Sequence, residues 1–253
     1  MTTPSTSTIP PQEQRARVSG SPGEGARLRG VLTLLAPLMA VVFVAGYLLR
    51  AAWPYPALHP ALAAAGVILL SVLAAALNWS CTGRLRAYVK GARGEEGVAR
   101  ELALLPAEYR VFHDVQFPDA AWWRCGAGCD HVVVGPNGIF VIETKNWSAP
   151  VTVENGEVLR LDGVVPSRPP LEQVHQAVSA FRRRLRGTPA EGAALAPVLC
   201  FAEGAVEGGV RGAGGVMLCR RAELNEMLLS VRDERVSPAA QNAASQALLR
   251  LME

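Results

Sequence analysis

Two carboxylates and a lysine lie at the ends of two neighbouring apolar segments of the sequence. Asp130 begins the segment Asp-His-Val-Val-Val, and Glu143 and Lys145 end the segment that starts at Ile139. Because Glu143 and Lys145 are two residues apart, they lie on the same face if this segment is a β-strand. Charged groups at the end of an apolar strand are costly to bury unless they have partners. The three side chains are therefore the first candidates for chemistry.

The turn at residues 135–138, Gly-Pro-Asn-Gly, joins the two segments and decides whether the carboxylates meet. With a four-residue loop, Val134 pairs with Ile139, and Asp130 lies opposite Glu143 with the two Cβ atoms about 5 Å apart. With a three-residue loop the register slips by one residue, and Asp130 moves to the opposite face of the sheet. The sequence leaves both registers open.

In the first register the three side chains could support metal-assisted hydrolysis. Two carboxylates so close repel each other unless a cation lies between them, and oxygen ligands with partial hydration suit Mg²⁺, or Mn²⁺. Asp130 and Glu143 would hold the metal, while Lys145 would hold a phosphate oxygen or orient an attacking water. An ordinary salt bridge between Asp130 and Lys145 is the simpler alternative, and spacing alone does not choose between the two.

The elements that must position this site predict a mixed α/β domain over residues 90–253. Helical patterns cover residues 95–105, 171–185, 222–229 and 238–251, and strand patterns cover residues 109–117, 130–134, 139–146, 151–154, 157–161, 196–202 and 215–219. The glycine-rich stretch 204–215 predicts a mobile loop. It lacks the Lys-Ser or Lys-Thr ending of a P-loop, and no small-molecule cofactor is expected.

Two uncharged segments precede this domain. Residues 1–29 are rich in Ser, Thr, Pro and Gly and predict a disordered tail. Val31–Leu49 and Ala61–Trp79 carry no charged residue, and each is long enough as a helix to cross a bilayer. We therefore expect a transmembrane hairpin of two helices over residues 30–80. A pair of buried helices in a soluble protein is the alternative.

The positive charges around these segments predict their orientation. Four arginines, at positions 15, 17, 27 and 29, precede the first segment, and Arg84, Arg86, Lys90 and Arg93 follow the second, whereas the connection holds only Arg50. The positive-inside rule then places both termini and the α/β domain in the cytoplasm, with two spans in the cell membrane and the lipid bilayer as a partner. The oligomeric state stays open, a homo-oligomer included.

The α/β domain resembles the nuclease-related (NERD) domain of the PD-(D/E)XK nuclease-like superfamily. The matching pieces are Gly94-Glu95-x-x-Val98-x-x-x-Leu102, residues 130–135, residues 138–146, Pro170-x-x-Gln173 and Pro197-Val198-Leu199. The resemblance implies a restriction-endonuclease-like mixed sheet flanked by helices and Mg²⁺-dependent cleavage of DNA or RNA. It implies that Asp130 and Glu143 are metal ligands and that Lys145 is the catalytic lysine. Glu95 would be a further acidic catalytic residue.

Several of these assignments have a plainer alternative. Glu95 could be a first-turn acid that favours the helix dipole. Gln173 would be a supporting polar group by the resemblance, whereas its helical position alone favours a solvated residue. Arg182, Arg183 and Arg184 are candidates for binding nucleic acid, but a solvated helix end or a contact with anionic lipid would explain them equally well.

The segment 119–129 departs from the family pattern. It contains two tryptophans, Cys125 and Cys129, and the two cysteines with His113 or His131 are a weak signal for zinc. The expected function is that of a membrane-anchored, metal-dependent nuclease, a hydrolase acting on cytosolic DNA or RNA. The alternative is a catalytically inactive nucleic-acid-binding or protein-interaction module at the membrane.

Overall fold

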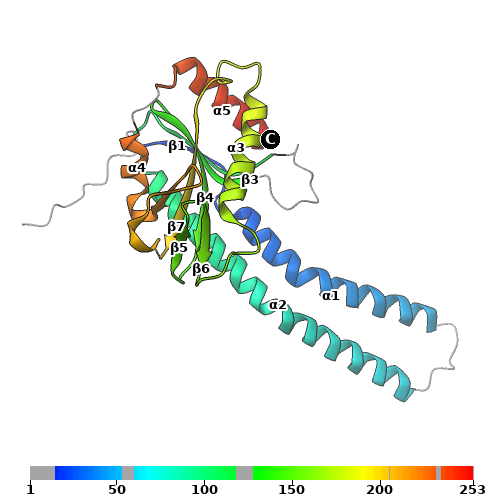
Figure 1. Ribbon diagram of the computed structural model, residues 1–253. Helices are drawn as coiled ribbons and strands as arrows, with labels where there is room; N and C mark the ends of the chain where they lie inside the picture. Colours follow the sequence, from blue (N-terminus) through cyan, green and yellow to red (C-terminus); the bar gives the residue numbers. More distant parts are fainter. Residues whose placement is uncertain (1–14, 53–59, 118–127, 205, 232–234, 253) are drawn as a thin grey trace, which may run out of the picture. The chain divides into compact units, whose positions relative to one another are not determined.

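A computed structural model describes residues 15–52, 60–117, 128–204, 206–231 and 235–252 (Figure 1). They form two compact units, which are described separately. One unit is helical and covers residues 24–92, and the other is built from the described residues up to Gly23 and from Arg93 onward. The segment 119–127, with its two tryptophans and Cys125, falls outside the described residues.

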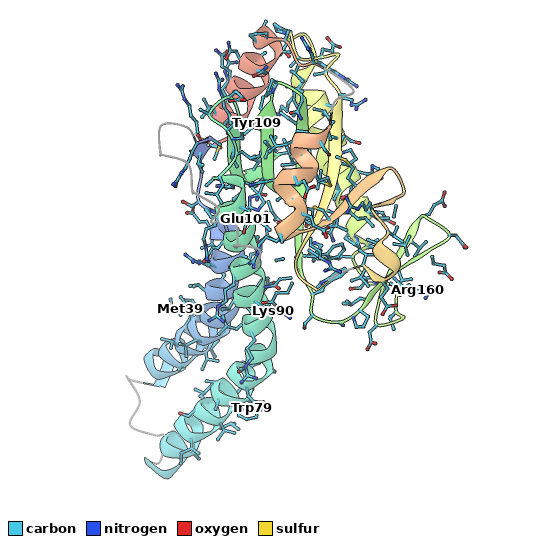
Figure 2. The ribbon with its side chains drawn as sticks, turned by 90° about the vertical axis from the view of Figure 1, so that its left-hand side faces the viewer. Met39, Trp79, Lys90, Glu101, Tyr109 and Arg160 are labelled. Carbon is cyan, nitrogen blue, oxygen red and sulfur yellow. The ribbon has the colours of Figure 1, made fainter. Side chains whose placement is uncertain are left out.

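The helical unit consists of α1 (Glu24–Ala52) and the first part of α2 (Pro60–Leu102). The two helices lie side by side (Figure 1), and a Cβ atom at Gly30 would lie 3.3 Å from Leu85 Cδ1. Their outer surfaces are apolar: Met39 on α1 and Trp79 on α2 are 65% and 85% exposed (Figure 2). Large apolar side chains left in the open are typical of a surface that another apolar phase covers.

One helix in the described part of the chain is long and apolar enough to cross a membrane, and it runs from Glu24 to Gly46. Its 23 residues would span about 34 Å at 1.5 Å per residue, close to the thickness of a bilayer core. In α2 the apolar stretch found is Ile68–Leu77, which is shorter than a span. The expected hairpin of two spans therefore remains a prediction.

The second unit is built on a mixed sheet of seven strands in the order β1-β2-β3-β4-β7-β9-β8. These strands are β1 (Arg17–Ser19), β2 (Arg110–Gln116), β3 (Gly128–Gly135), β4 (Gly138–Asn146), β7 (Leu195–Glu203), β8 (Gly212–Ala213) and β9 (Val216–Arg220). The central strands β4, β7 and β9 run parallel, whereas β3 runs antiparallel to both of its neighbours. A separate hairpin is formed by β5 (Val151–Glu154) and β6 (Val158–Leu161).

Helices cover both faces of this sheet, as the α/β pattern predicts. One face carries α3 (Pro170–Leu185) and α5 (Pro238–Met252), and the other carries α4 (Leu224–Ser230) and the end of α2 (Figure 1). The strand β4 is buried on both faces: Ile139 and Val141 belong to the core under α3, and Phe140 and Ile142 to the core under α4. This explains its nearly continuous apolar sequence.

The turn between β3 and β4 has the register that brings the carboxylates together. Val134 pairs with Ile139, and Gly135 pairs with Gly138, so that only Pro136 and Asn137 lie outside the ladder. The slipped register of a three-residue loop is therefore wrong. Asn137 stabilises the turn, because its Oδ1 accepts a hydrogen bond from Tyr109 and its Nδ2 donates to the carbonyl of Leu228.

Two segments differ from what the sequence predicts. The tail expected to be disordered over residues 1–29 includes β1, which pairs in parallel with β2, and α1 already begins at Glu24; residues 1–14 lie outside the described part. The expected loop at 204–215 contains a short 3₁₀ turn (Glu207–Gly209) and β8. Both strands are too short to show alternation in the sequence, and pairing with a neighbouring strand stabilises them.

Candidate active site

The end of the β3–β4 hairpin gathers the predicted site residues. Asp130 lies one residue before His131, which pairs with Ile142, and Glu143 follows Ile142 on the neighbouring strand. Lys145 lies two residues further along β4, on the same face as Glu143. These residues lie at the carboxyl end of β4, which is parallel to β7, and ligands of α/β sheets commonly bind at that edge.

Direct hydrogen bonds fix the orientation of Lys145. Its ammonium group donates to Glu143 Oε1 at 2.6 Å and to Gln173 Oε1 on α3 at 2.7 Å. The side chains of Lys145 and Glu143 are only 17% and 12% exposed. Gln173 in turn donates from Nε2 to the carbonyl of Arg168. The amide of Gln173 therefore positions the lysine from the facing helix and is not a solvated helix residue.

Asp130 is held by the backbone of the neighbouring strand. Its Oδ2 accepts a hydrogen bond from the Thr144 backbone N–H at 2.6 Å. Lys145 forms an ion pair with Glu143. The alternative left open by the sequence was a salt bridge between Lys145 and Asp130. The carboxylate of Asp130 thus faces the edge of β4 next to Glu143 and does not take the place of Glu143 as the partner of the lysine.

The electrostatics of the site show an excess of negative charge. Burial raises the pKa of Asp130 well above its usual value, and the neighbouring charges of Glu143 and Glu95 raise it further. Burial alone would favour neutral Lys145, but Glu143, Asp130 and Glu95 outweigh burial and raise its pKa. Lys145 is therefore a cation at neutral pH. The charges of Asp130, Glu143 and Glu95 all act on the single ammonium group of Lys145, an imbalance that a divalent cation would relieve.

The donor set fits a hydrated oxygen-seeking cation. The described residues contain no cluster of three or more His, Cys, Asp and Glu side chains that could hold a metal ion. Mg²⁺ does not require such a cluster, because it is commonly bound by one or two carboxylates and keeps several water molecules. Asp130 and Glu143 supply two carboxylates at one edge, so the chemistry of these residues suits Mg²⁺ better than zinc, which prefers three or four protein ligands.

Glu95 reaches the site because α2 passes very close to the end of β4. A Cβ atom at Gly94 would lie 2.7 Å from Asn146 Cβ and 3.2 Å from Ala202 Cβ. Only glycine permits this approach without a shift of the helix or the strands. The approach explains why the charge of Glu95 acts on both Asp130 and Lys145. The alternative that Glu95 is a first-turn acid is wrong, because α2 begins at Pro60 and Glu95 lies far inside it.

Gly94→Ala is expected to destabilise the domain by about 1–3 kcal/mol, because the added methyl group must push α2 away from β4. Gly91→Ala, on the same helix with nothing within 4 Å of the added Cβ, is the matched control. It should be stabilising by up to about 1 kcal/mol through helix propensity alone. Urea unfolding of both variants measures the difference, and equal effects of the two changes would contradict the close approach.

The two histidines suggested for zinc form a buried pair with each other. His113 and His131 are paired residues of β2 and β3, and their Nδ1 atoms lie 2.7 Å apart. Burial lowers the pKa of His113 to about 4 and that of His131 well below its usual value, so both imidazoles are neutral. The described residues hold no group of three or more His, Cys, Asp and Glu side chains around this pair, so they give no support to a zinc site with Cys129, which is buried.

The basic residues of α3 lie away from the acidic site. Arg182 and Arg183 are exposed and Arg184 is half-buried, all in the last turn of the helix. Gln173, which contacts Lys145, lies in the first turn. Eleven residues separate Gln173 from Arg184, which corresponds to about 16 Å along the helix axis. The structure brings Glu95, Asp130, Glu143 and Lys145 together, and it places the arginines at the other end of α3.

Comparison with known proteins gives one family match over part of the chain. Residues 90–202 match a family model described as "NERD: Nuclease-related domain". No curated protein and no solved structure matches the chain. The matched segment contains the acidic residues, Lys145 and Gln173, and it ends within β7, so β8, β9, α4 and α5 lie beyond it. The chain thus carries, over residues 90–202, a segment similar to the nuclease-related domain.

Proposed function

We propose that this protein is a metal-dependent nuclease that hydrolyses phosphodiester bonds in DNA or RNA. The observation that carries the proposal is the grouping of Asp130, Glu143 and a cationic Lys145 at one strand edge. The match of residues 90–202 to the nuclease-related domain supports the same reaction class. The restriction-endonuclease-like arrangement of the sheet is part of this proposal.

Each residue of the site has a distinct role in the proposed reaction. Asp130 and Glu143 hold Mg²⁺ or Mn²⁺, which when bound polarises the phosphate and lowers the pKa of a bound water. Lys145 donates hydrogen bonds to a phosphate oxygen and stabilises the charge that develops there. Gln173 keeps the ammonium group aimed at that oxygen. Because Lys145 is protonated, it acts as a charge stabiliser and not as a base.

Glu95 completes the acidic side of the site. Its charge raises the pKa of Asp130 in the metal-free protein, which places it within electrostatic range of the proposed metal position. A bound cation would be attracted by the charge of Glu95 as well as by those of Asp130 and Glu143. Glu95 therefore contributes to metal affinity, and its removal is expected to weaken metal binding more than folding.

The proposed location is the cell membrane, with the nuclease-like unit in the cytoplasm. The apolar helix Glu24–Gly46 and the exposed apolar side chains of α1 and α2 support insertion into a bilayer. The arginines on either side of the two apolar segments favour two spans with both termini in the cytoplasm. Cysteine-accessibility labelling of tagged termini in intact cells would test this topology.

The function is tested by a cleavage assay on the full-length chain in neutral detergent. Single- and double-stranded DNA and RNA are each incubated with Mg²⁺, with Mn²⁺ or with EDTA. We expect cleavage that requires the metal. If all four substrates stay intact while salt-sensitive binding of nucleic acid persists, the domain is a binding module and the nuclease proposal is overturned.

A further inference from the structure

A second polar pocket lies between the end of α3 and the end of α5, away from the acidic site. Its volume is about 310 Å³, and its polar lining comes from Arg184, Thr188, Gln246 and Arg250. Among the described residues, no acidic side chain lines this pocket. Two guanidinium groups with a side-chain amide are a donor set that suits a phosphate group.

The loop after α3 is held in place by its own hydrogen bonds. Thr188 Oγ1 donates to the Leu185 carbonyl at 2.6 Å and accepts from the Ala190 N–H at 3.2 Å. Glu191 uses Oε2 to accept a hydrogen bond from the Gly187 N–H at 2.8 Å. These hydrogen bonds hold the loop as a fixed wall of the pocket.

The pocket and the acidic site lie along the same side of α3. Gln173 and Arg184 are eleven residues apart, which is just over three full turns, so their side chains leave the helix in nearly the same direction. Gln173 contacts Lys145 at one end of this line, and Arg184 lines the pocket at the other. Arg182, by contrast, lies on the opposite side of the helix, nine residues from Gln173.

We propose that Arg184 and Arg250 form a phosphate-binding pocket that holds the backbone of the nucleic acid at a distance from the acidic site. This proposal rests on the proposed function. The pocket and Lys145 lie along the same side of α3, so the ligand in the pocket would be a nucleic-acid strand that also reaches Lys145. The separation is about 16 Å along the axis of α3. In a duplex, this length along the axis covers about five phosphates of one strand, at a rise of about 3.4 Å per phosphate. The pocket therefore sets how a substrate lies across the domain.

The test is equilibrium binding of a fluorescent duplex of about 20 base pairs to the full-length chain in neutral detergent. EDTA prevents metal-dependent cleavage, so binding is measured whether or not the protein is a nuclease. Arg184→Gln and Arg250→Gln are each expected to weaken binding about 10-fold, and to lower the slope of log K against log salt by about 1. Arg235→Gln is the charge-matched control, since Arg235 is exposed before the other end of α5.

Arg250 is exposed, so its replacement tests the pocket even if replacement of the half-buried Arg184 disturbs folding. Wild-type affinity and salt slope in Arg250→Gln would overturn the proposal. A loss of duplex affinity equal to that of Arg235→Gln would also overturn it, because the effect would then come from net charge and not from the pocket. A parallel titration adds phosphatidylglycerol to the micelles and follows the melting temperature. If Arg250→Gln abolishes stabilisation by this lipid and leaves duplex binding unchanged, the pocket is a lipid site and the proposal is overturned.

Discussion

Replacing Glu143 with glutamine is expected to lower Mg²⁺-dependent cleavage by about 10³-fold, a loss of about 4 kcal/mol of transition-state stabilisation. Glutamine keeps the shape of the side chain and an oxygen that can accept from Lys145, but it removes the charge proposed to hold the metal. The hydrogen bond between Lys145 and Glu143 is thus weakened and not deleted. Single-turnover cleavage at saturating substrate measures the effect on the chemical step.

Glu154→Gln is the matched control for this experiment. Glu154 is an exposed residue of β5, and it pairs with Arg160 at 2.7 Å. Its replacement removes the same charge from the same domain and should leave the cleavage rate within about 2-fold of wild type, because surface pairs contribute little. If the wild-type protein cleaves, a Glu143→Gln variant that cleaves at the rate of Glu154→Gln would remove Glu143 from the catalytic site.

Replacing Asp130 with asparagine is expected to stabilise the metal-free protein and to abolish its stabilisation by Mg²⁺. The neutral amide keeps an oxygen for the Thr144 N–H but removes a buried charge that Glu143 and Glu95 repel. Wild-type protein at a Mg²⁺ concentration of 100 times Kd should gain about 2.7 kcal/mol. For a chain of this size that gain corresponds to a melting temperature about 5–10 °C higher, measured by calorimetry with Mg²⁺ or EDTA.

The pH dependence of this difference has a defined sign. The pKa of Asp130 is raised in the folded state, so the folded protein binds more protons than the unfolded chain. The contribution of Asp130 to the free energy of unfolding therefore falls as the pH rises above its pKa in the unfolded chain, which is about 3.9. The advantage of Asp130→Asn over wild type should grow with pH in EDTA. The neutral pair His113 and His131 makes a contribution to stability that rises with pH, because burial lowers both pKa values. Wild type and Asp130→Asn share this pair, so the difference in stability between the two proteins reports on Asp130 alone.

Two outcomes would contradict this prediction. If the metal-free Asp130→Asn variant is less stable than wild type, favourable interactions of the Asp130 carboxylate outweigh its repulsion by Glu143 and Glu95. An equal rise of melting temperature with Mg²⁺ in variant and wild type would place the metal elsewhere. Glu154→Gln again serves as the control, since it should respond to Mg²⁺ as wild type does.

The sequence predicted most of the regular structure of the α/β unit. Strands with continuous apolar runs, such as β4, and the amphipathic helix α3 have strong periodic patterns, and both appear within one or two residues of the predicted bounds. The prediction failed for β1 and β8, which have three and two residues. Elements this short have no period to detect, and they form because a neighbouring strand offers backbone partners.

The sequence by itself marked Asp130, Glu143 and Lys145 as candidate site residues, because they lie at the ends of two neighbouring apolar segments. It could not choose between two registers of the turn, since both satisfy the same apolar pattern. The tertiary structure decided that choice by pairing Gly135 with Gly138. It also brought Gln173 to Lys145 and made Gly94 the point where α2 approaches β4. These contacts join residues far apart in the chain, and packing between elements, not local propensity, determines them.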